Sequence, residues 1–152
     1  MNFKELFSVS RVFITKPRYI LPTYKATIKT IKICDHLYEK EHHNNGTENA
    51  FRHALWNYLI CEKCYPISGS VKIVRDWSDH ITGLHEKLSP NQKLAKAMDL
   101  HNNRVGQFLF SENTLSEGEI IGRLEQKMNK AIKVINVLEI EKAKDKLVYI
   151  ED

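Results

Sequence analysis

The stretch from Gly46 to Tyr58, GTENAFRHALWNY, constrains the fold most, because it forms a helical pattern with no solvated side. At 3.6 residues per turn, one stripe is polar and aromatic while the opposite face is apolar. A surface helix would show Lys and Glu on its outer side. We therefore expect a buried or cleft-lining helix whose Arg52 and His53 have polar partners on other helices, since unpaired buried polar groups are costly.

The composition favours helices. With only 6 Gly and 4 Pro in 152 residues, and 42% hydrophobic against 28% charged residues, a turn-rich β fold is disfavoured. The length is that of one ordinary domain. We predict an all-α fold, a compact bundle of about five to six helices that forms a single domain over residues 1–152, with its motif core at 46–106.

The charge and the cysteines limit the partners and the compartment. The formal charge of +4 arises largely in the first forty residues, where Lys and Arg are spread rather than clustered. This pattern argues against nucleic acid and leaves a weak membrane-surface contact open. Three cysteines, and no apolar run long enough for a signal peptide or a transmembrane helix, lead us to expect a cytoplasmic protein. A leaderless route of export stays open.

Apolar spacing and capping residues place the other helices. The expected helices cover Asn2–Thr15, Thr23–Glu41, Val71–Leu88, Asn91–Phe110, and a last one from the Ser116–Glu119 capping box through Ile135. Thr47 is the expected N-cap of the central helix, and residues 65–70 are expected to form a loop. Lys146–Ile150 has strand composition but no identifiable partner, so a short extended tail is expected.

For two further sequence features, a structural interpretation is stronger than a functional one. His42 and His43 are neighbours in a loop, and we expect them to be solvated rather than metal ligands. Cys61 and Cys64 form a lone C-x-x-C without the second pair that a zinc site needs.

The helices after residue 70 supply polar partners for the central one. The apolar seam of Val71–Leu88 predicts that His85 points inward and that Glu86 lies toward a rim. In the next helix, Asp99 and Asn102 lie between Ala95 and Gly106 on one face, so small residues should let another helix approach closely. His101 falls on the neighbouring face, together with Leu94, Met98, Val105 and Phe108, which looks like core.

Three interpretations fit these residues. In the first, His53 is a general base oriented by Asp99, while Arg52 and Asn102 or Asn103 bind an anionic or carbonyl oxygen. In the second, a divalent metal ion that activates water is bound by a set drawn from His53, His85, Asp99, Glu86 and His101. In the third, Arg52 and Asp99 form a buried ion pair, and the network only fixes the register of the helices.

The motifs NAFRHALWN at Asn49–Asn57, LHE at Leu84–Glu86 and MDLHNNRVG at Met98–Gly106 resemble those of an uncharacterised bacterial domain family. Members of that family occur as short proteins and at the ends of large secreted proteins of the polymorphic-toxin kind. The resemblance covers about Gly46–Gly106. It implies that one site contains Arg52, His53, His85, Glu86, Asp99, Asn102 and Asn103, and that a toxin-like hydrolase is a reasonable expectation.

Taken together, the sequence predicts a hydrolase-like domain that acts on a phosphoester or a (phospho)lipid ester, with or without a divalent metal. His53, Asp99 and His85 are the expected catalytic residues, and Arg52, Asn49, Asn102 and Asn103 the expected substrate-binding residues. The expected metal ligands are His53, His85, Glu86 and Asp99. The alternative is a non-enzymatic binding module with a structural polar network. The sequence leaves the oligomeric state open.

Overall fold

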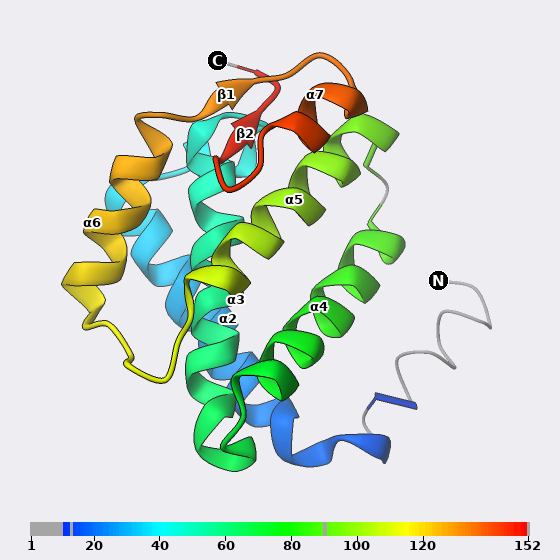
Figure 1. The fold of residues 1–152 in the computed structure, drawn as a ribbon, viewed down its shortest axis with the longest axis vertical. Helices are drawn as coiled ribbons and strands as arrows, with labels where there is room; N and C mark the ends of the chain where they lie inside the picture. Colours follow the sequence, from blue (N-terminus) through cyan, green and yellow to red (C-terminus); the bar gives the residue numbers. More distant parts are fainter. Residues whose placement is uncertain (1–10, 13, 90, 152) are drawn as a thin grey trace.

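A computed structural model describes residues 11–12, 14–89 and 91–151. Over these residues the fold is all-α, as predicted, with one very small sheet (Figure 1). The elements in chain order are α2 (Pro17–Tyr38), η1 (Glu41–His43), α3 (Thr47–Ser68), α4 (Val71–Leu88), α5 (Lys93–Leu109), α6 (Glu117–Met128), β1 (Ile132–Lys133), α7 (Val137–Lys142) and β2 (Val148–Tyr149). No helix of the described ranges is long and apolar enough to cross a membrane.

Helix α3 lies in the middle of the bundle, as the absence of a solvated side in its sequence predicts. It packs against α2, α4, α5 and α6, with α6 on one side and α4 and α5 on the other (Figure 1). Phe51, Leu55 and Tyr58 on its apolar face are fully buried, and His53 and Asn57 on the other face are buried as well. Both faces of α3 are therefore covered by other helices.

The close approach predicted at Gly106 is present. A Cβ atom at this position would lie 2.7 Å from the Cα and carbonyl carbon of Ala54, and closer still to its carbonyl oxygen. Helix α5 thus crosses α3 with backbone against backbone, a contact that only glycine permits. This crossing holds Asp99 and Asn103 of α5 close to His53 of α3.

The ends of several helices differ from the prediction. Helix α2 begins at Pro17, in the first turn where proline is well tolerated, and the expected helix Asn2–Thr15 lies largely outside the described residues. Gly46 rather than Thr47 is the N-cap of α3. The predicted loop at 65–70 is wrong in its first part, because α3 runs through Pro66 to Ser68 and ends at Gly69 with φ +64°.

The carboxyl-terminal part of the chain folds back onto α5. The Ser116–Glu119 capping box is confirmed, but α6 ends at Met128 and does not continue to Ile135, which is 75% exposed. The backbone after α6 is extended instead, because β1 pairs in parallel with β2, with Ile132 opposite Val148. The extended tail, for which the sequence identified no partner, therefore pairs with β1. A second, small core of Met98, Val134, Ile140, Ala143 and Val148 fixes this segment.

Candidate functional site

Three titratable side chains from three helices meet beside α3. His53 of α3, Glu86 of α4 and Asp99 of α5 are each at most 3% exposed, and one nitrogen or carboxylate oxygen of each lies within 4.8 Å of the others. His53 Nε2 is 3.3 Å from Asp99 Oδ1, and His53 Nδ1 is 3.9 Å from Glu86 Oε1. We call these three residues the central cluster.

The surrounding hydrogen bonds define the tautomer of His53. Asn103 Oδ1 accepts a hydrogen bond from Asn57 Nδ2 at 2.7 Å and lies 2.9 Å from His53 Nδ1. An oxygen with these two neighbours is an acceptor, so His53 Nδ1 carries the proton and Nε2 is an acceptor. Burial and the positive charge of Arg52 lower the pKa of His53 to about 3. The imidazole is therefore neutral around pH 7.

Arg52 connects the central cluster with the surface. Its Nη2 donates to His53 Nε2 at 3.1 Å and to Asn49 Oδ1, and Asn49 Nδ2 in turn donates to Asp99 Oδ1 at 3.0 Å. Its Nη1 lies 3.4 Å from Nδ1 of the exposed His43. The guanidinium is only half-buried, so one end faces the cluster and the other faces η1.

Glu86 lies inside the cluster, and the prediction that it would face a rim is wrong. Glu86 is 2% exposed, because it continues the stripe of Ser78 and Thr82, whose side chains point at α3. That stripe has the four-residue spacing of a buried helix face and was present in the sequence. Neither carboxylate oxygen has a hydrogen-bond partner in the described part of the chain. Burial, and then the charge of Asp99, raise the pKa of Glu86 from 4.5 to about 7.

His85 does not join the cluster and is exposed, so the inward orientation predicted for it is also wrong. Its ring packs edge-on against Trp56, 5.3 Å between centroids, and the other neighbour of Trp56 is His53 at 6.4 Å. With Trp56 and the apolar residues Ile81, Leu84 and Leu88, His85 lines a groove of about 330 Å³ beside α2. The indole therefore separates His85 from the cluster.

Asp99 has polar neighbours on both carboxylate oxygens. Oδ1 accepts from Asn49, and Oδ2 lies 3.5 Å from Nδ2 of the exposed Asn91, in the segment between α4 and α5. Burial nevertheless raises the pKa of Asp99 to about 6, although the two amides and Arg52 oppose that shift. Arg52 and Asn91 are thus the parts of this network that reach the surface.

Two asparagines have roles that sequence reasoning missed or misassigned. Asn57, which the sequence did not single out, accepts at Oδ1 from Ser78, Thr82 and Gln107 and donates through Nδ2 to Asn103. Its place four residues after His53 on the same stripe was the available signal. Asn102, expected to bind substrate, instead exchanges two hydrogen bonds of 2.9 and 3.0 Å with the backbone of Val148. It holds β2 against α5.

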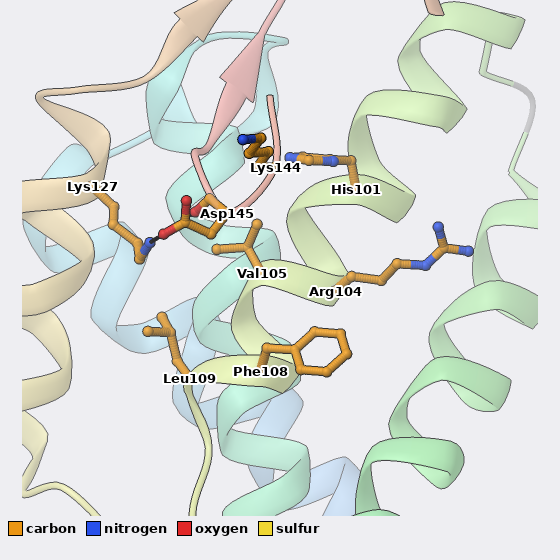
Figure 2. A pocket seen from close by; sticks show the side chains of 8 residues that line it. All are labelled: His101, Arg104, Val105, Phe108, Leu109, Lys127, Lys144 and Asp145. Carbon is orange, nitrogen blue, oxygen red and sulfur yellow. Dashed lines mark hydrogen bonds and ion pairs between the residues drawn. The ribbon is translucent and has the colours of Figure 1, made fainter. Parts of the chain in front are cut away.

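His101 faces a different part of the surface. Figure 2 shows it pointing toward Lys144, in a shallow pocket of about 370 Å³ that also contains Lys127 and Asp145. Its Nε2 lies 2.8 Å from the carbonyl oxygen of Lys146. His101 is therefore separate from the central cluster. Phe108, expected in the core, is 70% exposed on the same face, where Arg75 lies over its ring.

The prediction that both histidines before α3 are solvated is wrong for His42. His42 is completely buried, with Nε2 2.8 Å from Asp35 Oδ1 and with Nδ1 unpartnered among the described residues. His43 is exposed and stacks on it at 4.0 Å between centroids. Asp35, His42 and His43 form a second group with the spacing of metal ligands. The Arg52 side chain lies between this group and the central cluster, because its guanidinium contacts both His43 and His53.

The fold and this geometry define an all-α domain that buries a histidine and two carboxylates beside a half-exposed arginine. The chain belongs to the family described as "Domain of unknown function (DUF6973)", whose model matches residues 10–132. The match contains the whole central cluster with Arg52, Asn49 and Asn103, whereas β2 lies outside it. No curated protein and no solved structure matches the chain.

Proposed function

We propose that the protein is a hydrolase that cleaves a phosphoester or a (phospho)lipid ester at the central cluster. The observation that carries the proposal is the convergence of His53, Glu86 and Asp99, from three helices, on a guanidinium that reaches the surface. Hydrolysis needs groups that exchange protons beside a cation that binds the anionic centre of the substrate. This site combines both.

Among the three residues, Glu86 is the best suited to transfer a proton near neutral pH. A general acid or base works best when its pKa lies near the working pH, and that of Glu86 is raised to about 7. His53, with its pKa lowered to about 3, is too weak a base for the role that the sequence suggested. We assign it instead the part of a neutral partner that offers the Nε2 lone pair.

Arg52 is the residue that binds the anionic group of the substrate. Its planar guanidinium suits phosphate or carboxylate oxygens, and Asn49 orients it from the preceding turn of α3. Because the cluster itself is buried, the substrate approaches where the network is exposed, between Arg52 and Asn91.

Two further aspects belong to the same proposal. The motif resemblance favours a toxin-like hydrolase as the form of this activity. The three cysteines are free and buried, which supports action in a reducing compartment, the cytoplasm. Neither aspect affects the assignment of the residues.

The proposal is tested with purified protein on bis(p-nitrophenyl) phosphate and on vesicles that carry a fluorogenic phospholipid. Wild-type protein is expected to turn over one of these substrates, and Glu86→Gln and His53→Ala to lose about 10²–10⁴-fold in rate. Glu141→Gln removes an exposed carboxylate and is the matched control for the first variant. Melting curves show whether each variant is folded.

Two results would count against the proposal. One is turnover that survives both substitutions in the cluster, since the activity would then belong to another site. The other is a folded wild-type protein that hydrolyses no phosphoester or lipid ester, which would favour a binding module with a structural network.

A further inference from the structure

We propose that His53, Glu86 and Asp99 bind one divalent transition-metal ion of the Zn²⁺ or Mn²⁺ kind. The inference names the ligand of the same site. Its role in turnover rests on the proposed function, and in the metal-bound protein the metal-bound water would replace Glu86 as the group that exchanges the proton. The binding itself stands on the geometry alone.

The first argument is that the central cluster has an excess of acceptors. Both oxygens of Glu86 are buried and lack a hydrogen-bond partner among the described residues. His53 Nε2 and Asp99 Oδ1 lie 3.3 Å apart, and because the ring proton is on Nδ1, no hydrogen bond joins these two acceptors. Each accepts one hydrogen bond, from Arg52 and from Asn49, whereas Glu86 accepts none. Buried carboxylates are normally paired or coordinate a metal. A divalent cation would supply the partner that Glu86 lacks.

The second argument is the type and spacing of the donors. Metal–ligand distances of about 2.0–2.2 Å place two ligands of one ion at most about 4.4 Å apart. One ring nitrogen of His53 and one carboxylate oxygen each of Glu86 and Asp99 lie within 4.8 Å of one another, close to this limit. Glu86 Oε1 lies 3.9 Å from Nδ1, so its side chain would have to turn toward Nε2 to share an ion with Asp99. One imidazole with two carboxylates is a set that suits Zn²⁺ and Mn²⁺. Three protein ligands leave a further position for water, whose pKa the metal would lower.

The third argument concerns the orientation of His53. Metal-bound imidazoles almost always donate the other ring N–H to an oxygen that fixes the ring. His53 does so through Nδ1 to Asn103 Oδ1 at 2.9 Å, and Asn57 holds that amide in turn. The ring is therefore already oriented as a ligand.

Arg52 competes for the same position. Its Nη2 lies 3.1 Å from His53 Nε2 and would have to give up this contact when a metal ion binds. Its positive charge also opposes a second cation nearby. Removal of the guanidinium should therefore tighten metal binding, and metal binding should free Arg52 for the anionic substrate.

The alternative site in this chain is the group of Asp35, His42 and His43. It has a single carboxylate, which already pairs with His42, and two of its three members are exposed. His43 is within reach of Arg52. The central cluster has two carboxylates and one of them is unpaired, so it is the stronger site by charge and by unmet hydrogen-bonding capacity.

The experiment is calorimetric titration of the chelator-treated full chain with Zn²⁺ and with Mn²⁺ at pH 7, paired with melting curves in Mn²⁺. Mn²⁺ suits the melting curves because Zn²⁺ also binds the thiols of the unfolded chain. At a free concentration about 100 times Kd, we expect the Tm to rise by about 5–11 °C. Glu86→Gln and Asp99→Asn should each weaken binding at least about 100-fold, and Arg52→Gln should strengthen it several-fold. Asp35→Asn combined with His43→Gln, and Glu141→Gln, should leave the affinity unchanged.

The outcomes separate the inference from the proposed function. Absence of binding by the folded wild-type protein, or binding that is lost in the Asp35/His43 variant and kept in Glu86→Gln, overturns the inference. Turnover by metal-free protein would then still support the hydrolase. Stoichiometric binding at the central cluster without hydrolysis of any ester supports the inference and counts against the function. If Glu86→Gln does not fold, Asp99→Asn and the gain in Arg52→Gln decide.

Discussion

Replacement of Gly106 by alanine should separate α3 from α5 and destabilise the protein. The added methyl would lie 2.7 Å from two carbon atoms of Ala54, whereas carbon atoms in contact prefer about 3.5–4.0 Å. Because the atoms it meets belong to the backbone of a buried helix, no side-chain rotation can relieve the overlap. The helices must move apart by about 1 Å, in a protein interior that is densely packed.

The size of the effect follows from two opposing contributions. Overpacking of this kind costs about 1–3 kcal/mol, and a backbone obstacle places Gly106→Ala at the upper end. The better helix propensity of alanine returns about 0.5–1 kcal/mol. The net loss is about 2 kcal/mol. For a domain of this length, it corresponds to a Tm about 4–8 °C lower.

Thermal and urea unfolding followed by circular dichroism measure this loss. Gly83→Ala in α4 and Gly122→Ala in α6 are matched controls, because a Cβ at either position meets nothing within 4 Å. Both should raise the Tm slightly. If Gly106→Ala behaves like the two controls, the crossing of α3 and α5 is not as close as described, and the placement of Asp99 beside His53 loses its support.

Three other substitutions are expected to give distinct results. In chelator-treated protein, Glu86→Gln should be more stable than wild type at pH 8 and lose that advantage toward pH 5. The reason is that a carboxyl whose pKa is raised from 4.5 to about 7 stabilises the fold below pH 4.5, and this contribution of about 3 kcal/mol is lost as the pH rises through 7. Asn57→Ala should cost about 1–3 kcal/mol in chemical denaturation, since it leaves the buried Gln107 Nε2 unpaired, whereas the Ser78 and Thr82 hydroxyls keep backbone carbonyl acceptors. Asn102→Ala should increase hydrogen exchange of the Val148 amide at least about tenfold, since Asn102 Oδ1 accepts its hydrogen bond.

For each of these substitutions, one outcome would contradict the prediction. A stability difference between wild type and Glu86→Gln that does not change with pH would mean that the carboxylate is solvated rather than buried. A mild effect of Asn57→Ala, similar to that of the exposed Asn113→Ala, would contradict the network around α3. Unchanged exchange at Val148 would show that β1 alone holds the tail.

The sequence predicted the fold class, the central helix and the small-residue crossing because these depend on periodic patterns. It failed where a pattern has two possible faces. In α4 the apolar seam through Trp77 predicted the inward face. Ser78, Thr82 and Glu86 form a second buried face, which meets α3 and α5. A helix packed on two sides buries a wider arc than a single seam indicates. For this reason Glu86 is buried and His85 is exposed, the reverse of the prediction.

The carboxyl-terminal segment shows a different limit. The isoleucines at 132 and 135 continue the helical spacing of α6, yet the backbone there is extended. Its hydrogen bonds go to residues near 148, as from Ile132 N–H to the Leu147 carbonyl at 2.9 Å. A parallel pairing between segments so far apart depends on what lies between them and on Asn102, which no local pattern reveals. Local sequence patterns therefore could not predict the partner of β2.

The buried polar residues around α3 differ in how fully their side chains are hydrogen-bonded. Asn57 and Asn102 use both their oxygen and their amide nitrogen, so each fixes the position of neighbouring elements. Glu86 uses neither oxygen, and an apolar side chain of similar size would be less costly to bury there. A network that served only to hold the helices in register would not need a carboxylate at that position. These two unpaired carboxylate oxygens are the ones that the proposed metal ion would bind.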